Sequence, residues 1–206
     1  MEDTKNRIVE HAMKLFIQKG CKTLTMDEVA TTLGVSKRTI YENFSNKNEL
    51  IEACLEHFFE KHEQAIKVVL KSSDNIIDAM FKQMHTESIM MRKVKYNFFT
   101  EIRKYYPEVY RNVIKIYEER HMSDSREMMT KGQKDGVIRE DLNVEMISVI
   151  MHELTTTMLN GDMFANYDFD QQEMMGTLMH ALMRGICSEK GIVIFDKYVE
   201  EIKNKQ

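Results

Sequence analysis

The stretch TMDEVATTLGVSKRTIYENFSNKNEL, residues 25–50, decides the fold of this chain. Thr25 with Glu28 three positions later is the pattern of a capping box, in which each side chain bonds the other residue's backbone N–H at a helix start. Apolar residues then recur at helical spacing until Gly34, because glycine takes the left-handed conformation that ends helices at little cost. Ser36 follows as a fresh N-cap. The stretch therefore predicts two short helices joined by a tight turn.

The second of these helices carries side chains that suit DNA. Its apolar positions, Ile40 and Phe44, should turn inward. The outward positions begin with Lys37-Arg38-Thr39, at the N-terminal end of the helix. Two short helices about a glycine-containing turn, the second starting with two cations, indicate a DNA-binding helix-turn-helix.

Over about residues 4–55 the sequence resembles the N-terminal domain of TetR-type transcriptional regulators. The residues that carry the resemblance form an ungapped set of glycines, hydroxyl residues and aromatics. They are Gly20, Thr25, Val29-Ala30, Leu33-Gly34-Val35-Ser36, Ile40-Tyr41, Phe44, Lys47 and Leu50. Asn43 departs from the pattern, since the family more often has histidine or tyrosine there. The resemblance implies an all-α protein with a three-helix DNA-binding domain, residues 1–48, and a larger helical ligand-binding and dimerisation domain, residues 49–206.

We predict that eight residues of this region contact DNA. Arg38 is the first candidate for reading bases, because an arginine can donate two parallel hydrogen bonds to guanine. Tyr41 and Lys47 bind phosphate in the family, and the resemblance implies the same here. An ordinary solvated helix start is the alternative for these side chains. The complete set is Thr25, Ser36, Lys37, Arg38, Thr39, Tyr41, Asn43 and Lys47.

The composition agrees with a helical protein. The chain has 206 residues, of which 43% are hydrophobic, with one proline, eight glycines and no tryptophan. Such a composition favours helices with few turns. Apolar periodicity and capping residues predict about nine or ten helices. They cover about 4–19, 25–33, 37–43, 46–70, 92–105, 107–136, 143–160 and 170–186, with one more after Asp74 and a last one after Gly191.

Charge and cysteine usage set weaker bounds on function. Residues 1–50 hold eight Lys and Arg against seven Asp and Glu, whereas the remainder holds 21 against 26. This asymmetry is typical of a DNA-facing end on a more acidic body. The three cysteines lack a CxxC pair, which favours reduced thiols. The longest apolar run, residues 192–195, is far too short for a membrane span, so we expect a soluble, cytoplasmic protein.

Patterns for catalysis, cofactors and metals are missing from the sequence. It contains no glycine-rich phosphate loop, no HExxH and no nucleophile elbow. His152 and Glu153 are adjacent, whereas a helical di-metal site needs Glu-x-x-His. His57 and His62 point about 140° apart on their helix and cannot share a metal ion. We therefore expect neither an enzyme nor a cofactor.

The resemblance also implies an inducer pocket and a dimer interface in the C-terminal domain. From Met80 onward the chain holds 15 of the 18 methionines, which are adaptable in binding sites but equally suited to filling a core. Candidates for lining a pocket are Phe81, Met84, Tyr96, Phe98, Tyr117, His121, Met151 and Thr155. Candidates for the dimer interface form the two longest apolar stripes: Ile147, Met151, Leu154, Met158, Met175, Leu178, Met179, Leu182, Met183 and Ile186.

These features together predict a homodimeric TetR-type regulator. We expect a repressor that binds a pseudo-palindromic operator and is released by a small apolar or amphipathic ligand. Two alternatives remain open: a DNA-binding protein under the control of a protein partner or of no inducer, and a helical metal-binding protein or enzyme whose N-terminal resemblance is incidental.

Overall fold

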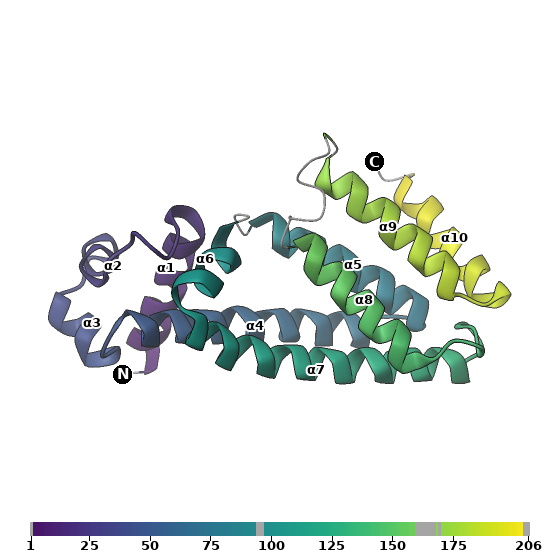
Figure 1. Ribbon diagram of the computed structural model, residues 1–206, viewed down its shortest axis with the longest axis horizontal. Helices are drawn as coiled ribbons and strands as arrows, with labels where there is room; N and C mark the ends of the chain where they lie inside the picture. Colours follow the sequence, from purple (N-terminus) through teal and green to yellow (C-terminus); the bar gives the residue numbers. More distant parts are fainter. Residues whose placement is uncertain (1, 94–96, 160–167, 169, 204–206) are drawn as a thin grey trace. The chain divides into compact units, whose positions relative to one another are not determined.

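The computed structural model describes residues 2–93, 97–159, 168 and 170–203, and within them the chain forms ten α-helices (Figure 1). The all-α class is confirmed. An isolated β-bridge joins Ile138 to Cys187. The helices are α1 (Glu2–Lys19), α2 (Met26–Leu33), α3 (Lys37–Asn43), α4 (Lys47–Lys71), α5 (Ile76–Lys93), α6 (Asn97–Tyr105), α7 (Pro107–Lys134), α8 (Val144–Leu159), α9 (Gln171–Ile186) and α10 (Glu189–Lys203).

Two helix boundaries differ from the prediction. Arg92 lies in α5, and the next described helix, α6, begins at Asn97. The last helix begins at Glu189 and so contains Gly191, after which it was expected to start. The reason is Ser188, whose hydroxyl oxygen accepts a hydrogen bond from the backbone N–H of Gly191 at 3.1 Å, the contact of an N-cap.

The chain packs as two compact units. Unit 1 contains residues 1–65 and 90–118, and unit 2 contains residues 66–89 and 119–206. This division is not the predicted one at residue 48, because the first part of α4, α6 and the first part of α7 share a core with α1–α3. The helix-turn-helix is therefore one end of a larger folded body.

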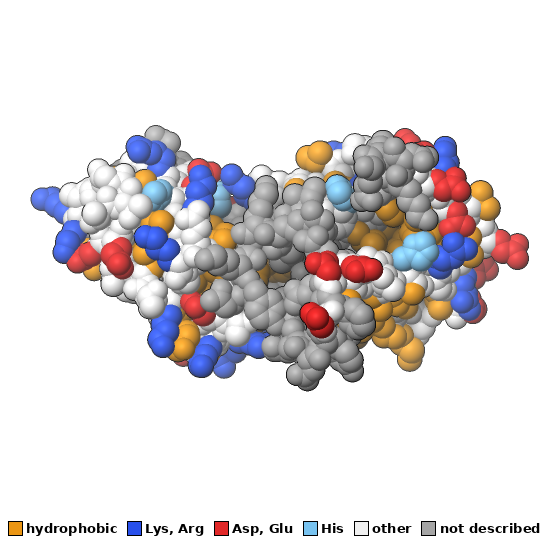
Figure 2. Space-filling model, turned by 90° about the horizontal axis from the view of Figure 1, so that it is seen from above, with side chains coloured by type: hydrophobic (Ala, Val, Ile, Leu, Met, Phe, Trp, Pro, Cys, Tyr) orange, Lys and Arg blue, Asp and Glu red, His pale blue; other side chains and the backbone are white. Residues whose placement is uncertain are grey.

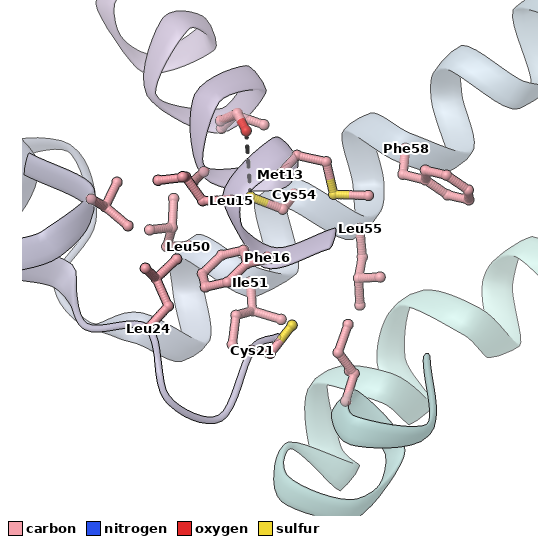
Figure 3. Packing of buried hydrophobic residues seen from close by; sticks show 14 of the residues in the cluster. Met13, Leu15, Phe16, Cys21, Leu24, Leu50, Ile51, Cys54, Leu55 and Phe58 are labelled. Carbon is pink, nitrogen blue, oxygen red and sulfur yellow. Dashed lines mark hydrogen bonds between the residues drawn. The ribbon is translucent and has the colours of Figure 1, made fainter. Parts of the chain in front are cut away.

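The core of unit 1 explains why α1 is a scaffold for the helix-turn-helix. Phe16 of α1, Leu24 of the following loop and Leu50 of α4 pack together (Figure 3). Ile40 in the middle of α3 and Phe44 just after its end are fully buried in the same core. Burial of each such side chain contributes about 1.5–3 kcal/mol, so α3 is held firmly from behind.

Unit 2 has a separate core built from α5, α7, α9 and α10. Its most deeply buried members include Ile77, Met129, Met183, Ile186 and Phe195. The methionines of this core fill space between helices, which is the structural alternative to lining a pocket.

Candidate DNA-binding surface

The start of α2 has the predicted capping box. Glu28 accepts a hydrogen bond from the Thr25 backbone N–H at 2.7 Å, and Thr25 Oγ1 accepts one from the Glu28 backbone N–H at 3.2 Å. These bonds with Thr25 lower the pKa of the Glu28 carboxyl group. The carboxylate form is thereby favoured, and it holds Thr25 at the edge of the predicted DNA surface.

The turn between α2 and α3 is formed by Gly34 and Ser36. Gly34 has φ of +72°, a left-handed conformation, and its N–H bonds back to the end of α2. Ser36 Oγ accepts the Thr39 backbone N–H at 3.0 Å and so begins α3. The Ser36 and Thr39 hydroxyl oxygens lie 2.8 Å apart. The turn therefore presents α3 as a short, well-capped helix.

The outward face of α3 consists of exposed polar side chains. Arg38 has an 86% exposed side chain, and its Nε donates to Glu42 at 2.7 Å. Lys37 is paired with Asp27 of α2. Tyr41 is 51% exposed. Figure 2 shows Lys and Arg side chains around the end that carries α1–α3, with Asp and Glu among them.

Lys47 and Asn43 make contacts that the sequence does not reveal. Lys47 Nζ donates to the Lys22 carbonyl oxygen at 3.1 Å and lies 5.6 Å from the centre of the Tyr106 ring. Asn43 Nδ2 donates to the Thr39 carbonyl oxygen at 2.8 Å, within its own helix. Lys47 thus lies beside the α1–α2 loop, and one of the two amide N–H donors of Asn43 is bonded within α3. Their contacts with DNA stay predictions.

Sequence reasoning missed the residues that bind the α1–α2 loop from outside the helix-turn-helix. Glu101 of α6 accepts hydrogen bonds from the backbone N–H groups of Cys21 at 2.7 Å and Lys22 at 3.2 Å. Tyr106 donates its hydroxyl to the Cys21 carbonyl at 3.3 Å. A side chain at Gly20 would collide with the Glu101 carboxylate, since its Cβ would lie 2.7 Å from an oxygen. No local pattern announces contacts between residues about 80 positions apart.

The three cysteines are free thiols buried in the protein. Burial raises the pKa of Cys21 to about 12, with a further contribution from the charge of Glu101. Burial likewise raises the pKa of Cys54, whose Sγ donates to the Val9 carbonyl (Figure 3). Burial raises the pKa of Cys187 to about 11. All three groups therefore stay protonated at neutral pH.

The eight residues predicted to line an inducer pocket do not all belong to the same hydrophobic core. Phe98 is buried in the core of unit 1 with 1% exposure, away from the candidates of unit 2, and its assignment to a pocket stays a prediction. Tyr117, also in unit 1, stacks on Phe59 and bonds His62 Nδ1 at 2.5 Å. The half-buried candidates of unit 2 are Phe81, Met84, His121 and Met151. Tyr96 and the side chain of Thr155 lie outside the described residues.

The predicted dimer stripe is mostly the inward face of its helices. Met179, Met183 and Ile186 are buried in the core of unit 2, with at most 7% exposure, so these three are corrected from interface to core. Ile147 and Met151 pack against the same core. Leu154, Leu178 and Leu182 are half-buried, and the side chains of Met158 and Met175 lie outside the description.

A different face of α8 and α9 points outward. On α8, Met146, Val149 and Ile150 are 66%, 40% and 47% exposed. The outward positions of α9 carry smaller or polar residues. They are Glu173, Gly176, Thr177, His180, Ala181, Arg184 and Gly185. Periodicity identified both helices as amphipathic, but their own core uses the stripe that we assigned to a partner.

Metal-ligand geometry and membrane-spanning helices are not found within the described residues. His121 and His152 have ring centres 5.9 Å apart, but no third histidine, cysteine or carboxylate joins them to form a candidate metal site in that part of the chain. No described helix combines the length and apolar content that crossing a bilayer requires.

Comparison with known proteins places the surface in a family context. Residues 8–54 match the model of bacterial regulatory proteins of the tetR family. The uncharacterized HTH-type transcriptional regulator YhgD of Bacillus subtilis is 27% identical over 190 residues, which cover 90% of this chain and 98% of YhgD. The biofilm operon negative transcriptional regulator IcaR of Staphylococcus aureus is 27% identical over 78 residues, 38% of this chain and 42% of IcaR. The chain therefore spans nearly all of the first relative and less than half of the second.

A solved structure has a similar fold along most of the chain. The putative transcriptional regulator from Saccharomonospora viridis, in complex with choline, superimposes with a TM-score of 0.75. The match covers 92% of this chain and all of that one, at 16% identity.

Proposed function

We propose that this chain is a homodimeric repressor of the TetR type that is released by a small ligand, because residues 8–54 match the tetR family model and YhgD is similar along nearly the whole chain. The observation that carries the proposal is the arrangement of α3. This helix is capped at both ends, its cations are exposed, and its apolar side is buried through Ile40 and Phe44. Two such helices in one dimer would enter successive major grooves, about 34–36 Å apart. The operator is then a pseudo-palindrome.

The exposed residues of α3 divide into base readers and phosphate binders. Arg38 reads guanine through two parallel hydrogen bonds, and its ion pair with Glu42 is given up on binding. Lys37 and Thr39 contact bases or phosphates beside it, while Tyr41 binds the backbone. Thr25, Ser36 and Asn43 complete the contacts to phosphate.

We expect Lys47→Ala to weaken binding to all duplex sequences alike. Lys47 supplies charge at the N-terminus of α4, where backbone N–H groups already favour anions. Losing its phosphate contact lowers the slope of log affinity against log salt by about one unit for each bound subunit. Salt titrations followed by fluorescence anisotropy measure this slope. Curves that superimpose on those of the wild-type protein would reject the assignment.

The outward face of α8 and α9 supports a dimer. Three exposed apolar residues on α8 and the small residues on α9 allow two copies to approach closely about a two-fold axis. Half-buried Leu154, Leu178 and Leu182 would lie at the edge of this face.

Ile150→Glu should therefore shift the protein toward monomer. Burying a carboxylate at the centre of the interface raises the dimer dissociation constant at least about tenfold. Sedimentation equilibrium measures the change. Val193→Glu is the matched control, because Val193 is an exposed apolar residue of α10, 72% exposed, outside the proposed interface. Equal behaviour of the two variants would contradict this interface.

The ligand we propose is small and apolar or amphipathic. Unit 2 offers a methionine-rich interior around Phe81, Met84 and Met151. Ser148 of α8 is completely buried, and its hydroxyl has no hydrogen-bond partner within the described part of the chain. A polar group on an otherwise apolar ligand would satisfy it. The related structure from Saccharomonospora viridis also holds a small molecule with a hydroxyl group, choline, although choline is a cation.

Ligand binding would act on DNA through α4, which contributes residues to both units. The ligand shifts the balance only by its difference in affinity between two conformations. The expected change is in the distance between the two Arg38 residues of the dimer. A ligand that releases operator without altering this distance would disprove the α4 part of the proposal.

Selection of binding sites from random DNA tests the function itself. The expected product is a palindrome with two half-sites, and a monomeric site would contradict the dimer. Failure to enrich any sequence would contradict specific DNA recognition.

A further inference from the structure

A cluster of two lysines and a tyrosine lies beside the helix-turn-helix. Lys22 comes from the α1–α2 loop, and Lys104 and Tyr105 come from the end of α6. The Nζ atoms of Lys22 and Lys104 lie 4.8 Å and 5.4 Å from the centre of the Tyr105 ring. All three residues are exposed and belong to unit 1. We call them the Tyr105 cluster.

The Tyr105 cluster has positive charge that the protein does not neutralise. Neither ammonium group is ion-paired with a carboxylate in the part of the chain that the structure describes. The carboxylate of Glu101 accepts backbone N–H groups of the loop that carries Lys22. A hydrogen bond from Lys22 and the charge of Lys104 lower the pKa of the Tyr105 hydroxyl. Two cations that repel each other around one phenol form a site for an anion.

The cluster is continuous with the predicted phosphate contact of Lys47. The carbonyl of Lys22 accepts the hydrogen bond from Lys47 Nζ at 3.1 Å. Lys47 also stands over Tyr106, the neighbour of Tyr105. Phosphates on one DNA strand rise by about 3.4 Å each, so a backbone held by Lys47 brings further phosphates within reach of the cluster.

A structural explanation accounts for where the two cations lie. Cations in the last turn of a helix are stabilised by the helix dipole, and Arg103 and Lys104 occupy the last turn of α6. Lys22 comes from outside that helix, and its ammonium group is attracted to the face of the Tyr105 ring. Neither contact supplies a full negative charge, so both ammonium groups keep charge that an anion can neutralise.

We propose that the Tyr105 cluster is a second phosphate-binding site, through which α6 contacts DNA directly. The inference rests on the proposed function and extends the DNA surface beyond residues 8–54. Two ammonium groups and a hydroxyl bind a backbone phosphate without reading bases. The contact lies on the same helix as Glu101, so a movement of α6 would change DNA affinity without passing through α3.

The test compares Lys104→Ala with Lys61→Ala on an operator duplex recovered by selection and carrying ten extra base pairs on each side. Lys61 is an exposed lysine about 21 Å along α4 from Lys47. Lys104→Ala should lower the salt slope by about 0.9 per subunit and leave the preference for operator over scrambled duplex unchanged. Lys104→Arg should restore the slope, and Lys22→Ala should reproduce the loss with an unaltered unfolding curve.

Each result separates the cluster from the function on which it rests. If wild-type protein binds the duplex and Lys104→Ala has the slope of Lys61→Ala, the cluster is not a phosphate site, although DNA binding stands. If Lys104→Ala changes the preference among sequences, Lys104 contacts bases, and the proposal of a phosphate site is wrong. If wild-type protein binds no duplex, the proposed function itself fails.

Discussion

Replacing Arg38 with alanine should remove most of the preference for operator over random DNA. A bidentate arginine–guanine pair contributes about 1–3 kcal/mol of discrimination, and a homodimer makes the contact twice. The operator affinity should therefore fall at least about 30-fold, since each 1.4 kcal/mol is a factor of ten. The 86% exposure of the Arg38 side chain means that folding should be unaffected. Anisotropy titrations with operator and scrambled duplexes measure both affinities.

The controls for Arg38 distinguish base reading from charge. Arg38→Lys keeps the charge but not the planar pair of donors, so it should retain non-specific binding and lose specificity. Glu42→Gln removes the carboxylate that pairs with Arg38 and should not lower operator affinity. If Arg38→Ala lowered binding to both duplexes by the same factor, Arg38 would be a phosphate contact.

Replacing Glu101 with alanine should lower the free energy of unfolding by about 2–3 kcal/mol, because two backbone N–H groups lose a charged acceptor. Part of this contact is open to water, which keeps the loss below that of a fully buried pair. The loop that carries Lys22 and precedes Thr25 would also lose its support from α6. Urea denaturation of the full chain measures the change.

Glu101→Gln and Glu60→Ala complete that experiment. Glutamine retains a neutral acceptor in nearly the same place and should cost about half as much as alanine. Glu60 is an exposed glutamate of α4, and its loss should leave stability within about 0.5 kcal/mol of wild type. If Glu101→Ala had the same urea midpoint of unfolding as the wild-type protein, the α1–α2 loop would hold its conformation without α6.

The helix-turn-helix is predictable from sequence because the interactions that form it are local. Thr25, Gly34 and Ser36 act on neighbours within a few residues, and the two short helices follow from them. Ser188 is a similar local signal, and it sets the start of α10 before Gly191.

The remainder depends on contacts between distant residues. Periodicity shows that α8 and α9 have an apolar stripe, but not whether that stripe faces its own core or a partner. Met183 on that stripe belongs to the core. Glu101 looks like any surface glutamate in sequence, and its partners are about 80 positions away. For the same reason, the sequence does not reveal that Lys22 and Lys104 both lie over the Tyr105 ring.

The burial of Cys21 and Cys54 limits what this regulator can sense. With a pKa of about 12, only roughly one Cys21 thiol in 10⁵ is ionised at neutral pH, and the thiolate is the form that reacts. Peroxides and electrophiles that need a thiolate therefore react poorly with Cys21 and Cys54. The small ligand that we propose would instead act by reversible occupancy, which dilution undoes without repair by a reductase.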